Sequence, residues 1–308
     1  MLLLRRPPLA DDDPRATALA IGNFDGLHRG HRALIDRVIA APDLRPGLMC
    51  FEPLPRTFFA PDRPVPRVMK LRDRVRLGSD LGLELIAAMR FDGDFSSLTP
   101  EAFAADVVAR GLRAARVVVG EDFRFGHRAA GDVDALRAFG RRFGFDVETL
   151  AAVVDPKTGR RVSSSWLREA LADGDLATAE RLLGRPYAIS GRVIHGNEIG
   201  RTLGFPTANI RVAEPPALSG VCAVRVHGAG LEGRPAVASL GQRPVVAGRD
   251  WLLEVHLFDY DGDLYGKHLL VEFVDRIRPE LPFDDLDAMT ARMHDDAEQA
   301  RRILRAPP

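Results

Sequence analysis

Two histidines stand among three glycines in the segment IGNFDGLHRGH, residues 21–31. The apolar run TALAIGNF predicts a buried strand, and HRALIDRVIAA after it predicts a helix with one apolar face. In an open α/β sheet, ligands bind beyond the carboxyl ends of the strands, where the N-terminus of the next helix offers N–H groups to an anion. His28 and His31, three residues apart on the first helical turn, would both donate hydrogen bonds to phosphate oxygens.

The glycines of this segment, Gly22, Gly26 and Gly30, would let the backbone approach a ligand closely. A metal site is disfavoured because no third ligand follows at metal-binding spacing. The simpler alternative is a Gly-rich turn whose histidines are merely hydrogen-bonded, since short motifs often occur by chance.

A second candidate phosphate site is the segment RVSSSWLREAL, residues 161–171. It places three serines, Ser163, Ser164 and Ser165, at the predicted start of a helix. Arg161 precedes them and Arg168 follows one turn later. Hydroxyls, free N–H groups and arginines together favour phosphate binding. The alternative is an ordinary serine N-cap on an amphipathic helix.

Strand-like and helical runs alternate over the first 184 residues, which predicts βαβ units and a parallel sheet. Strands are expected at 47–51, 83–89, 115–123 and 145–153, and helices at 71–82, 99–112, 132–144, 163–174 and 175–184. From residue 187 the runs become short and β-like, which predicts an antiparallel barrel or sandwich. DYDGDLYG, residues 259–266, is typical of a hairpin, and 283–304 predicts a C-terminal helix. We therefore expect two domains, 1–184 and 185–308.

The composition narrows the function classes. Lysine plus arginine and aspartate plus glutamate each number 43, and this neutral balance argues against a dedicated duplex-DNA binder. We expect no nucleic-acid partner. The two cysteines form no spaced framework and no CxxC, which favours a reducing compartment without structural zinc. The start of the chain does not fit a signal peptide, and no apolar run approaches membrane-spanning length. We expect a cytoplasmic protein with no membrane association.

HxGH after a first strand, followed by a serine-rich segment ending in arginine, resembles the nucleotidyltransferase superfamily. With FEPLPR (51–56) and VVVGEDFRFG (117–126), the first half resembles the FMN adenylyltransferase module of bacterial bifunctional riboflavin kinase/FAD synthetases. The second half resembles the riboflavin kinase signature in SGRVIHGNEIGRTLGFPTANI (190–210), LEVHLFDYDGDLYG (253–266) and VEFVDRIRPELPFDDLDAM (271–289). The resemblance implies a Rossmann-like nucleotidyltransferase domain followed by a β-barrel kinase domain with a C-terminal helix.

For the second half, the resemblance implies that riboflavin is phosphorylated by Mg-ATP. Thr207 and Asn209 supply two neutral oxygens on an extended segment, which suits magnesium, and the resemblance implies that they bind it. Glu254 would take the proton of the ribityl 5′-hydroxyl. The remaining implied contacts are His195, Gly196, Gly200 and Arg201 over the ATP phosphates, and Arg243 with the flavin.

For the first half, the resemblance implies that FMN attacks the α-phosphorus of ATP, so that FAD forms and pyrophosphate leaves. His28 and His31 would hold the phosphates in the transition state. The other implied ATP contacts are Gly22, Asn23, Phe24, Asp25, Gly26, Arg161, Ser164, Ser165 and Arg168. Asp122, Phe123 and Phe125 are candidate flavin contacts, although the two phenylalanines fit an ordinary core equally well.

Four residues depart from the family pattern: Leu54 stands where a histidine is usual, Cys222 replaces an aromatic residue, Ser239 an amide, and Val245 a threonine. We expect both activities, with weakened kinase activity or altered flavin affinity. Two alternatives stay open: a chain with one active half, and a flavin- or nucleotide-binding regulator without turnover. We expect small-molecule substrates as the partners of a monomer or weak homo-oligomer.

Overall fold

The structure, a computed structural model, describes residues 1–9, 12–196, 204–245, 248–283 and 285–305. Its internal contacts divide the chain into two compact units. The first comprises Met1–Val65 and Met69–Ser163, and the second comprises Pro66–Val68 and Ser164–Pro308. Each unit is described by itself below.

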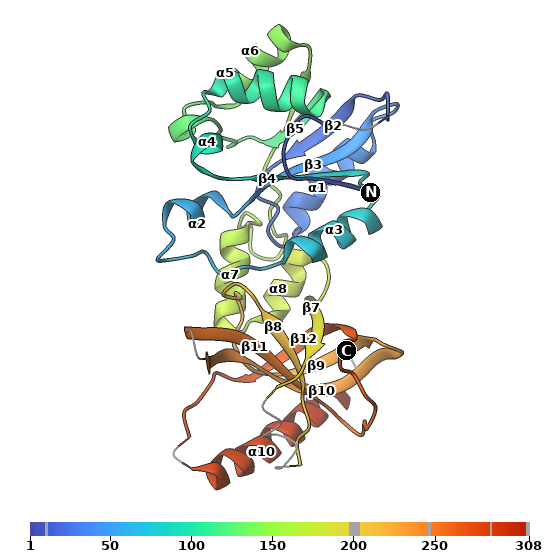
Figure 1. Cartoon of the computed structure of the whole chain (residues 1–308), viewed down its shortest axis with the longest axis vertical. Coiled ribbons are helices and arrows are strands. Elements are labelled where there is room, and N and C mark those ends of the chain that lie inside the picture. Colours follow the sequence, from blue (N-terminus) through green and yellow to red (C-terminus); the bar gives the residue numbers. More distant parts are fainter. Residues whose placement is uncertain (10–11, 197–203, 246–247, 284, 306–308) are drawn as a thin grey trace. The chain divides into compact units, whose positions relative to one another are not determined.

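The first unit is built on a parallel sheet of six strands in the order β1-β4-β3-β2-β5-β6 (Figure 1). The strands are β1 Leu2–Leu4, β2 Thr17–Ile21, β3 Arg45–Glu52, β4 Leu85–Arg90, β5 Ala114–Gly120 and β6 Asp146–Leu150. This confirms the predicted parallel α/β sheet. The edge strand β1, which pairs with β4, was not predicted, because three leucines carry no periodic pattern.

Helices cover both faces of this sheet, and alternate residues of its strands enter two separate cores. Leu19 and Ile21 of β2 pack into one core, and Ala18 and Ala20 pack into the other. Such two-sided burial is typical of parallel sheets. The helices are α1 Arg29–Ile39, α2 Pro55–Phe59, α3 Leu71–Asp80, α4 Gly93–Ser96, α5 Pro100–Ala102, the π-type η1 Phe103–Gly111, the 3₁₀ turn η2 His127–Ala129 and α6 Val133–Phe143. The helix expected over 99–112 is therefore a short α-helical turn followed by a wider π-helix.

The second unit begins with helices α7 Ser164–Asp173 and α8 Leu176–Leu183 and continues into a closed antiparallel barrel of order β10-β11-β8-β7-β12-β9 (Figure 1). Its strands are β7 Tyr187–Ile194, β8 Ala208–Val212, β9 Gly220–Gly228, β10 Leu231–Val245, β11 Gly248–Leu257 and β12 His268–Arg278. The barrel is confirmed, whereas the hairpin expected at 259–266 is wrong. Strand β11 pairs with β10 and β8, and β12 pairs with β7 and β9, so this loop joins strands that are not neighbours.

Side chains alternate between the inside and the outside of the barrel. On β11, Leu253 and Val255 are fully buried, while Glu254 between them is partly exposed on the outer face. The C-terminal helix α10, Leu286–Arg305, packs on the outer face through Ala297, Ala300 and Leu304. A buried ion pair also fixes this helix, because both Nε and Nη2 of Arg278 on β12 donate to the carboxylate of Asp296.

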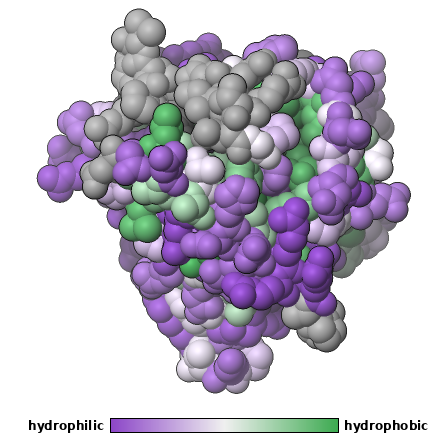
Figure 2. Space-filling model, turned by 90° about the horizontal axis from the view of Figure 1, so that it is seen from below, coloured by the Kyte–Doolittle hydropathy of each residue, from purple (hydrophilic) through white to green (hydrophobic). Residues whose placement is uncertain are grey.

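The surface and the helices were also compared with what a membrane protein requires. Figure 2 shows a face on which hydrophilic residues predominate and hydrophobic residues form smaller patches. Among the described residues, no helix has both the length and the apolar character that a bilayer span requires.

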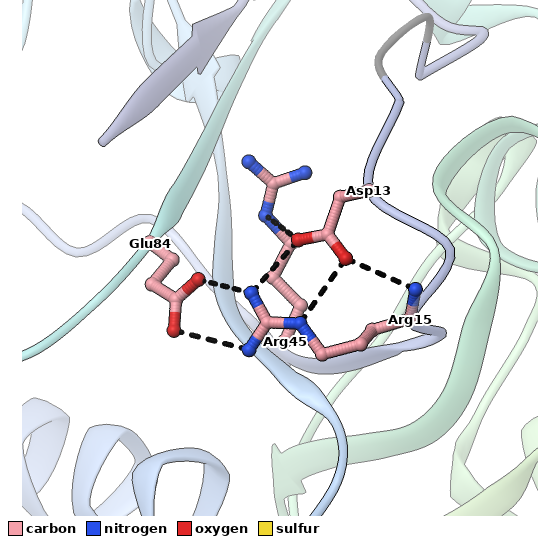
Figure 3. Close-up of polar contacts among 4 residues, drawn as sticks. All are labelled: Asp13, Arg15, Arg45 and Glu84. Carbon is pink, nitrogen blue, oxygen red and sulfur yellow. Dashed lines mark hydrogen bonds and ion pairs between the residues drawn. The ribbon is translucent and has the colours of Figure 1, made fainter.

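Figure 3 shows an ionic cluster in which Arg15 donates to both Asp13 and Glu84, with Arg45 nearby. These residues lie at the starts of β2, β3 and β4, so the cluster joins the amino ends of the central strands.

Candidate active sites in the two units

The segment between β2 and α1 is a tight turn held by its own side chains. His28 is the N-cap of α1, and its Nδ1 accepts a hydrogen bond of 3.2 Å from the backbone N–H of His31. The two imidazole rings stack with centroids 3.6 Å apart. Because Nδ1 is an acceptor, the neutral His28 ring carries its proton on Nε2, which is the donor form that a phosphate oxygen needs. The predicted pairing of His28 and His31 is thus present.

Close packing explains the glycines of this turn. A Cβ on Gly30 would lie 3.2 Å from His28 Cε1 and 3.6 Å from the carbonyl oxygen of Val162. A side chain there would therefore push on the His28 ring. Gly26 has a φ of 98°, a conformation that favours glycine. The short distance between Gly30 and Val162 also shows that the segment after Arg161 runs beside the start of α1.

Phe24 and Asp25, predicted to contact ATP, are both fully buried. Phe24 adopts a φ of 50° and packs against the ring of His31 with centroids 4.9 Å apart. Asp25 Oδ1 accepts a hydrogen bond of 3.0 Å from the Met69 backbone N–H. The structure therefore gives these two residues a part in shaping the turn. Gly22 and Asn23 lie at its entrance, directly after β2.

A fully buried arginine lies near the turn, and sequence reasoning missed it. Arg74 on α3 has no exposed surface, and its Nη1 donates to Cys50 Sγ at 3.1 Å and to Glu52 Oε1 at 2.9 Å. Burial opposes the charged form, but the nearby Cys50, Glu52 and Asp25 outweigh it, and the pKa of Arg74 lies above its usual range. Arg74 thus supports the end of β3 and the carboxylate of Asp25. The pattern of LRDRVRLG gives no sign of this burial.

Asp122 and Arg161, predicted for flavin and ATP, form a bidentate ion pair with distances of 2.9 and 2.8 Å. Arg161 donates to the carboxylate and thereby lowers the pKa of Asp122. Phe125 is buried in the core of the unit, whereas Phe123 is only partly buried and stacks on it with centroids 5.6 Å apart. The core alternative therefore fits Phe125, and Phe123 keeps a surface for a ligand.

An aromatic cluster beyond the carboxyl ends of β3 and β4 was also missed. Phe58 and Phe59 of α2 each pack against Phe91, with centroids 5.4 and 5.8 Å apart, and Phe51 also packs against Phe91. Phe59 is 68% exposed, although it is a large apolar side chain. The signal in the sequence was the string RTFF inside a proline-rich segment.

The serine-rich segment starts helix α7. Ser164 is the first residue of the helix, Ser165 is exposed on its first turn, and Arg168 lies one turn later. Arg168 Nε donates to the Pro66 carbonyl oxygen at 2.8 Å. By its contacts, α7 belongs to the second unit. The predicted arrangement of three serines and an arginine at a helix N-terminus is present, with Ser163 directly before the helix, and the ATP role of Ser164, Ser165 and Arg168 stays a prediction.

The candidate kinase site lies on the outer face of the barrel. The hydroxyl of Thr207 lies 3.5 Å from Asn209 Oδ1, so the two predicted magnesium ligands are neighbours on one face. In the sheet register, Asn209 on β8 is directly opposite Glu254 on β11, and Glu254 is directly opposite Ser239 on β10. Two neutral oxygens beside a carboxylate fit a magnesium ion that also keeps waters and phosphate oxygens.

The loop after β7 approaches this site closely. A Cβ on Gly196 would lie 2.2 Å from Asn209 Nδ2, so glycine is required for the observed contact. His195 stacks on Tyr265 with ring centroids 3.8 Å apart, a contact that the sequence did not predict. Arg243 lies on β10. The predicted ATP contacts Gly200 and Arg201 lie outside the described residues.

Three of the four departures from the family pattern have described side chains, and the fourth, Val245, is the last residue of β10. Cys222 is fully buried among the inward-facing residues of β9, and burial raises the pKa of its thiol to about 12. Leu54 is buried immediately before α2. Ser239 lies directly opposite Glu254 in the sheet register, on the strand at the other side of β11 from Asn209.

The two units together define a Rossmann-like nucleotidyltransferase fold combined with an antiparallel barrel that carries a carboxylate and two neutral oxygens on its outer face. Residues 10–166 match the family described as FAD synthetase, and residues 183–304 match the family described as riboflavin kinase. The chain belongs to the family of bifunctional riboflavin kinase/FMN adenylyltransferases.

Curated members of this family are similar over nearly the whole chain. The protein of this name from Escherichia coli strain K12 is 44% identical over 93% of this chain and 92% of its own length. That from Haemophilus influenzae is 38% identical over 99% of both chains. Among solved structures, one from Streptococcus pneumoniae, named as a macrolide-efflux protein, has a TM-score of 0.77 and 29% identity over 97% of this chain and 98% of that chain.

Proposed function

We propose that this chain phosphorylates riboflavin to FMN at the barrel and adenylylates FMN to FAD at the Gly-rich turn, with ATP as the second substrate of both reactions. The observation that carries the proposal is the alignment of Thr207, Asn209 and Glu254 on one face of the barrel, in a chain that also has the stacked histidines of the turn. A binding protein without turnover has no need of a carboxylate base beside an oxygen pair.

At the barrel, Glu254 accepts the proton of the ribityl 5′-hydroxyl. The freed oxygen attacks the γ-phosphorus of ATP, the bond from that phosphorus to the β-phosphate oxygen breaks, and ADP leaves. Thr207 Oγ1 and Asn209 Oδ1 would hold Mg²⁺, which when bound neutralises negative charge on the phosphates. His195, Gly196, Gly200 and Arg201 contribute the loop over the phosphates, and Arg243 contacts the flavin. A positioned base accounts for roughly 10²–10⁴ in rate.

At the Gly-rich turn, a phosphate oxygen of FMN attacks the α-phosphorus of ATP, and pyrophosphate leaves. His28 and His31 donate hydrogen bonds to the phosphate oxygens as charge grows in the transition state. Gly22, Asn23 and Gly26 line the nucleotide, and the buried Phe24 and Asp25 give the turn its shape. The further phosphate contacts are Arg161, Ser164, Ser165 and Arg168.

The flavin of FMN needs an apolar, aromatic surface. Asp122 and Phe123 border one side of the candidate site, with Phe125 supporting Phe123 from the core. Phe58, Phe59 and Phe91 offer a second aromatic surface, and Phe59 has a large exposed area for its size. An isoalloxazine ring stacked on such a surface loses water from both partners, which favours binding.

The proposal also covers the bounds of the two modules, the location of the protein, its oligomeric state and its partners. The adenylyltransferase module spans 1–184 and the kinase module spans 185–308. The protein works in the cytoplasm as a monomer or weak homo-oligomer, and it binds neither nucleic acid nor membranes. Leu54, Cys222, Ser239 and Val245 alter rates or flavin affinity without removing either activity.

A single incubation tests the proposal. Purified protein is mixed with riboflavin, ATP and MgCl₂, and the flavins are separated by chromatography over time. FMN should appear first and FAD second, with pyrophosphate released in step with FAD. Only riboflavin remaining, together with no FAD when FMN is supplied instead, would contradict both halves of the proposal.

A further inference from the structure

His256 lies in the candidate kinase site without a role in the reaction described above. It follows Glu254 by two residues on β11, so both side chains point to the outer face of the barrel. The last residue pair between β11 and β8 joins Val255 to Ala208, which places His256 level with Thr207. The His256 Nδ1 lies 2.9 Å from the carbonyl oxygen of Pro206.

The direction of this hydrogen bond is fixed by its partners. A carbonyl oxygen only accepts, so Nδ1 of His256 carries the proton and donates. Burial of the ring lowers the pKa of His256, and the bond to Pro206 opposes this only in part. The charged neighbours are Arg301 on α10, which favours the neutral ring, and Asp259, which opposes it.

Aromatic neighbours hold the ring in place. The His256 ring lies 4.9 Å from that of Phe205 and 5.9 Å from that of Phe258. Phe205 also packs against His294 of α10, with centroids 4.8 Å apart. The His256 ring is therefore held between Phe205 and Phe258, and its Nδ1 hydrogen bond is directed at the turn before β8.

The position of Thr207 depends on the turn before β8. Strand β8 begins at Ala208, so the strand ladder starts one residue after Thr207. Pro206 has no N–H and can be fixed by hydrogen bonding only through its carbonyl group. The bond from His256 is therefore a direct link from the strand that carries Glu254 to the residue before Thr207.

We propose that His256 is a positioning residue of the kinase site, which fixes the Phe205–Pro206–Thr207 turn so that Thr207 Oγ1 stays level with Asn209 Oδ1 and Glu254. The proposal rests on the proposed kinase function. His256 acts through Thr207, because its Nδ1 is engaged with Pro206 and its ring packs between Phe205 and Phe258.

The test compares His256→Phe, which keeps a ring but removes the donor, with His256→Asn, whose amide N–H can replace Nδ1–H. Both are made in the full chain, and the KM for Mg-ATP and the KM for riboflavin are measured separately. Loss of one neutral hydrogen bond predicts that His256→Phe raises the KM for Mg-ATP between about 2-fold and 12-fold. The KM for riboflavin should change less than the KM for Mg-ATP, and His256→Asn should recover most of the loss.

Two controls separate positioning from general damage. FAD formation from supplied FMN reports the other half of the same chain and should be unchanged. His227→Phe removes another barrel histidine, which pairs with Glu272 at 3.0 Å, and should leave both KM values unchanged. In a double-mutant cycle, His256→Phe should add little to Thr207→Ala, because the residue it positions is already lost.

Several results would overturn the proposal. They are an unchanged KM for Mg-ATP in His256→Phe, an equal rise in both KM values, no recovery in His256→Asn, or full additivity with Thr207→Ala. Absence of FMN formation by the wild-type chain would instead count against the proposed function. Calorimetric titration with Mg-ADP in a His28→Ala/His31→Ala background then decides the role of His256, since weaker binding by His256→Phe supports it and equal binding refutes it.

Discussion

Replacing Gly196 by alanine should lower the kinase activity while leaving the protein folded. A Cβ at this position would lie 2.2 Å from Nδ2 and 3.0 Å from Cγ of Asn209, whereas ordinary contact begins at 3.4 Å. The amide nitrogen must therefore retreat by the difference of 1.2 Å. Because the amide is planar and rigid, Oδ1 moves with it. The atoms displaced first belong to the end of a side chain, so the barrel itself should stay folded.

The expected loss follows from this displacement. A misplacement of about 1 Å in a reacting site costs up to roughly 10²-fold in rate. That corresponds to about 2.7 kcal/mol of transition-state stabilisation. We therefore expect kcat/KM for FMN formation to fall roughly 10²-fold, with a melting temperature close to that of the wild type.

The assay follows FMN formation from riboflavin, with FAD formation from FMN in the same preparation as the internal control. Gly93→Ala is the matched variant, because a Cβ there would meet no atom within 4 Å. It should leave both reactions unchanged. A Gly196→Ala protein whose kinase activity stays within about 3-fold of the wild type would show that the position of the Asn209 oxygen does not matter, against the 10²-fold loss expected.

Three further predictions concern the first unit. Asp13 has its pKa lowered to about 2, mainly by the hydrogen bond from Arg15, so its contribution to stability should be present above pH 3.8 and be lost as pH falls toward 2. Urea unfolding should therefore show the wild type losing its advantage over Asp13→Asn in that window. Arg74→Met leaves Glu52 without its buried partner and should lower the free energy of unfolding by about 3–5 kcal/mol in the same measurement. Gly30→Ala presses on the His28 ring and should slow FAD formation while FMN formation continues, as chromatography of the flavins would reveal.

Local rules were sufficient to predict the Gly-rich turn between β2 and α1. An apolar strand, three glycines and a histidine at a helix start are neighbours in the chain, so their types and spacing suffice. The same rules gave the serine-rich start of α7. They did not reveal that His28 is itself the N-cap, because a histidine there can serve either the helix or a ligand.

The remaining features depend on contacts between distant parts of the chain, which local sequence patterns do not predict. Asn209 and Glu254 are neighbours because of the register in which β8 and β11 pair. These two strands are adjacent in the barrel but are separated in the chain by β9 and β10. In this case the family resemblance supplied the pairing. Arg74 belongs to a polar stretch that predicts a solvated helix face, yet its partners on β3 hold it at zero exposure. The DYDGDLYG loop has good turn residues, but turn chemistry alone does not decide which strands pair.

The central claim is that two separate sites in this chain perform the two reactions in order. The most direct test compares Glu254→Gln with His28→Ala/His31→Ala, each supplied with riboflavin and, separately, with FMN. Glu254→Gln should form no FMN from riboflavin yet convert supplied FMN to FAD, and the double histidine variant should accumulate FMN without FAD. Loss of both products in either variant, with the protein still folded, would contradict the account.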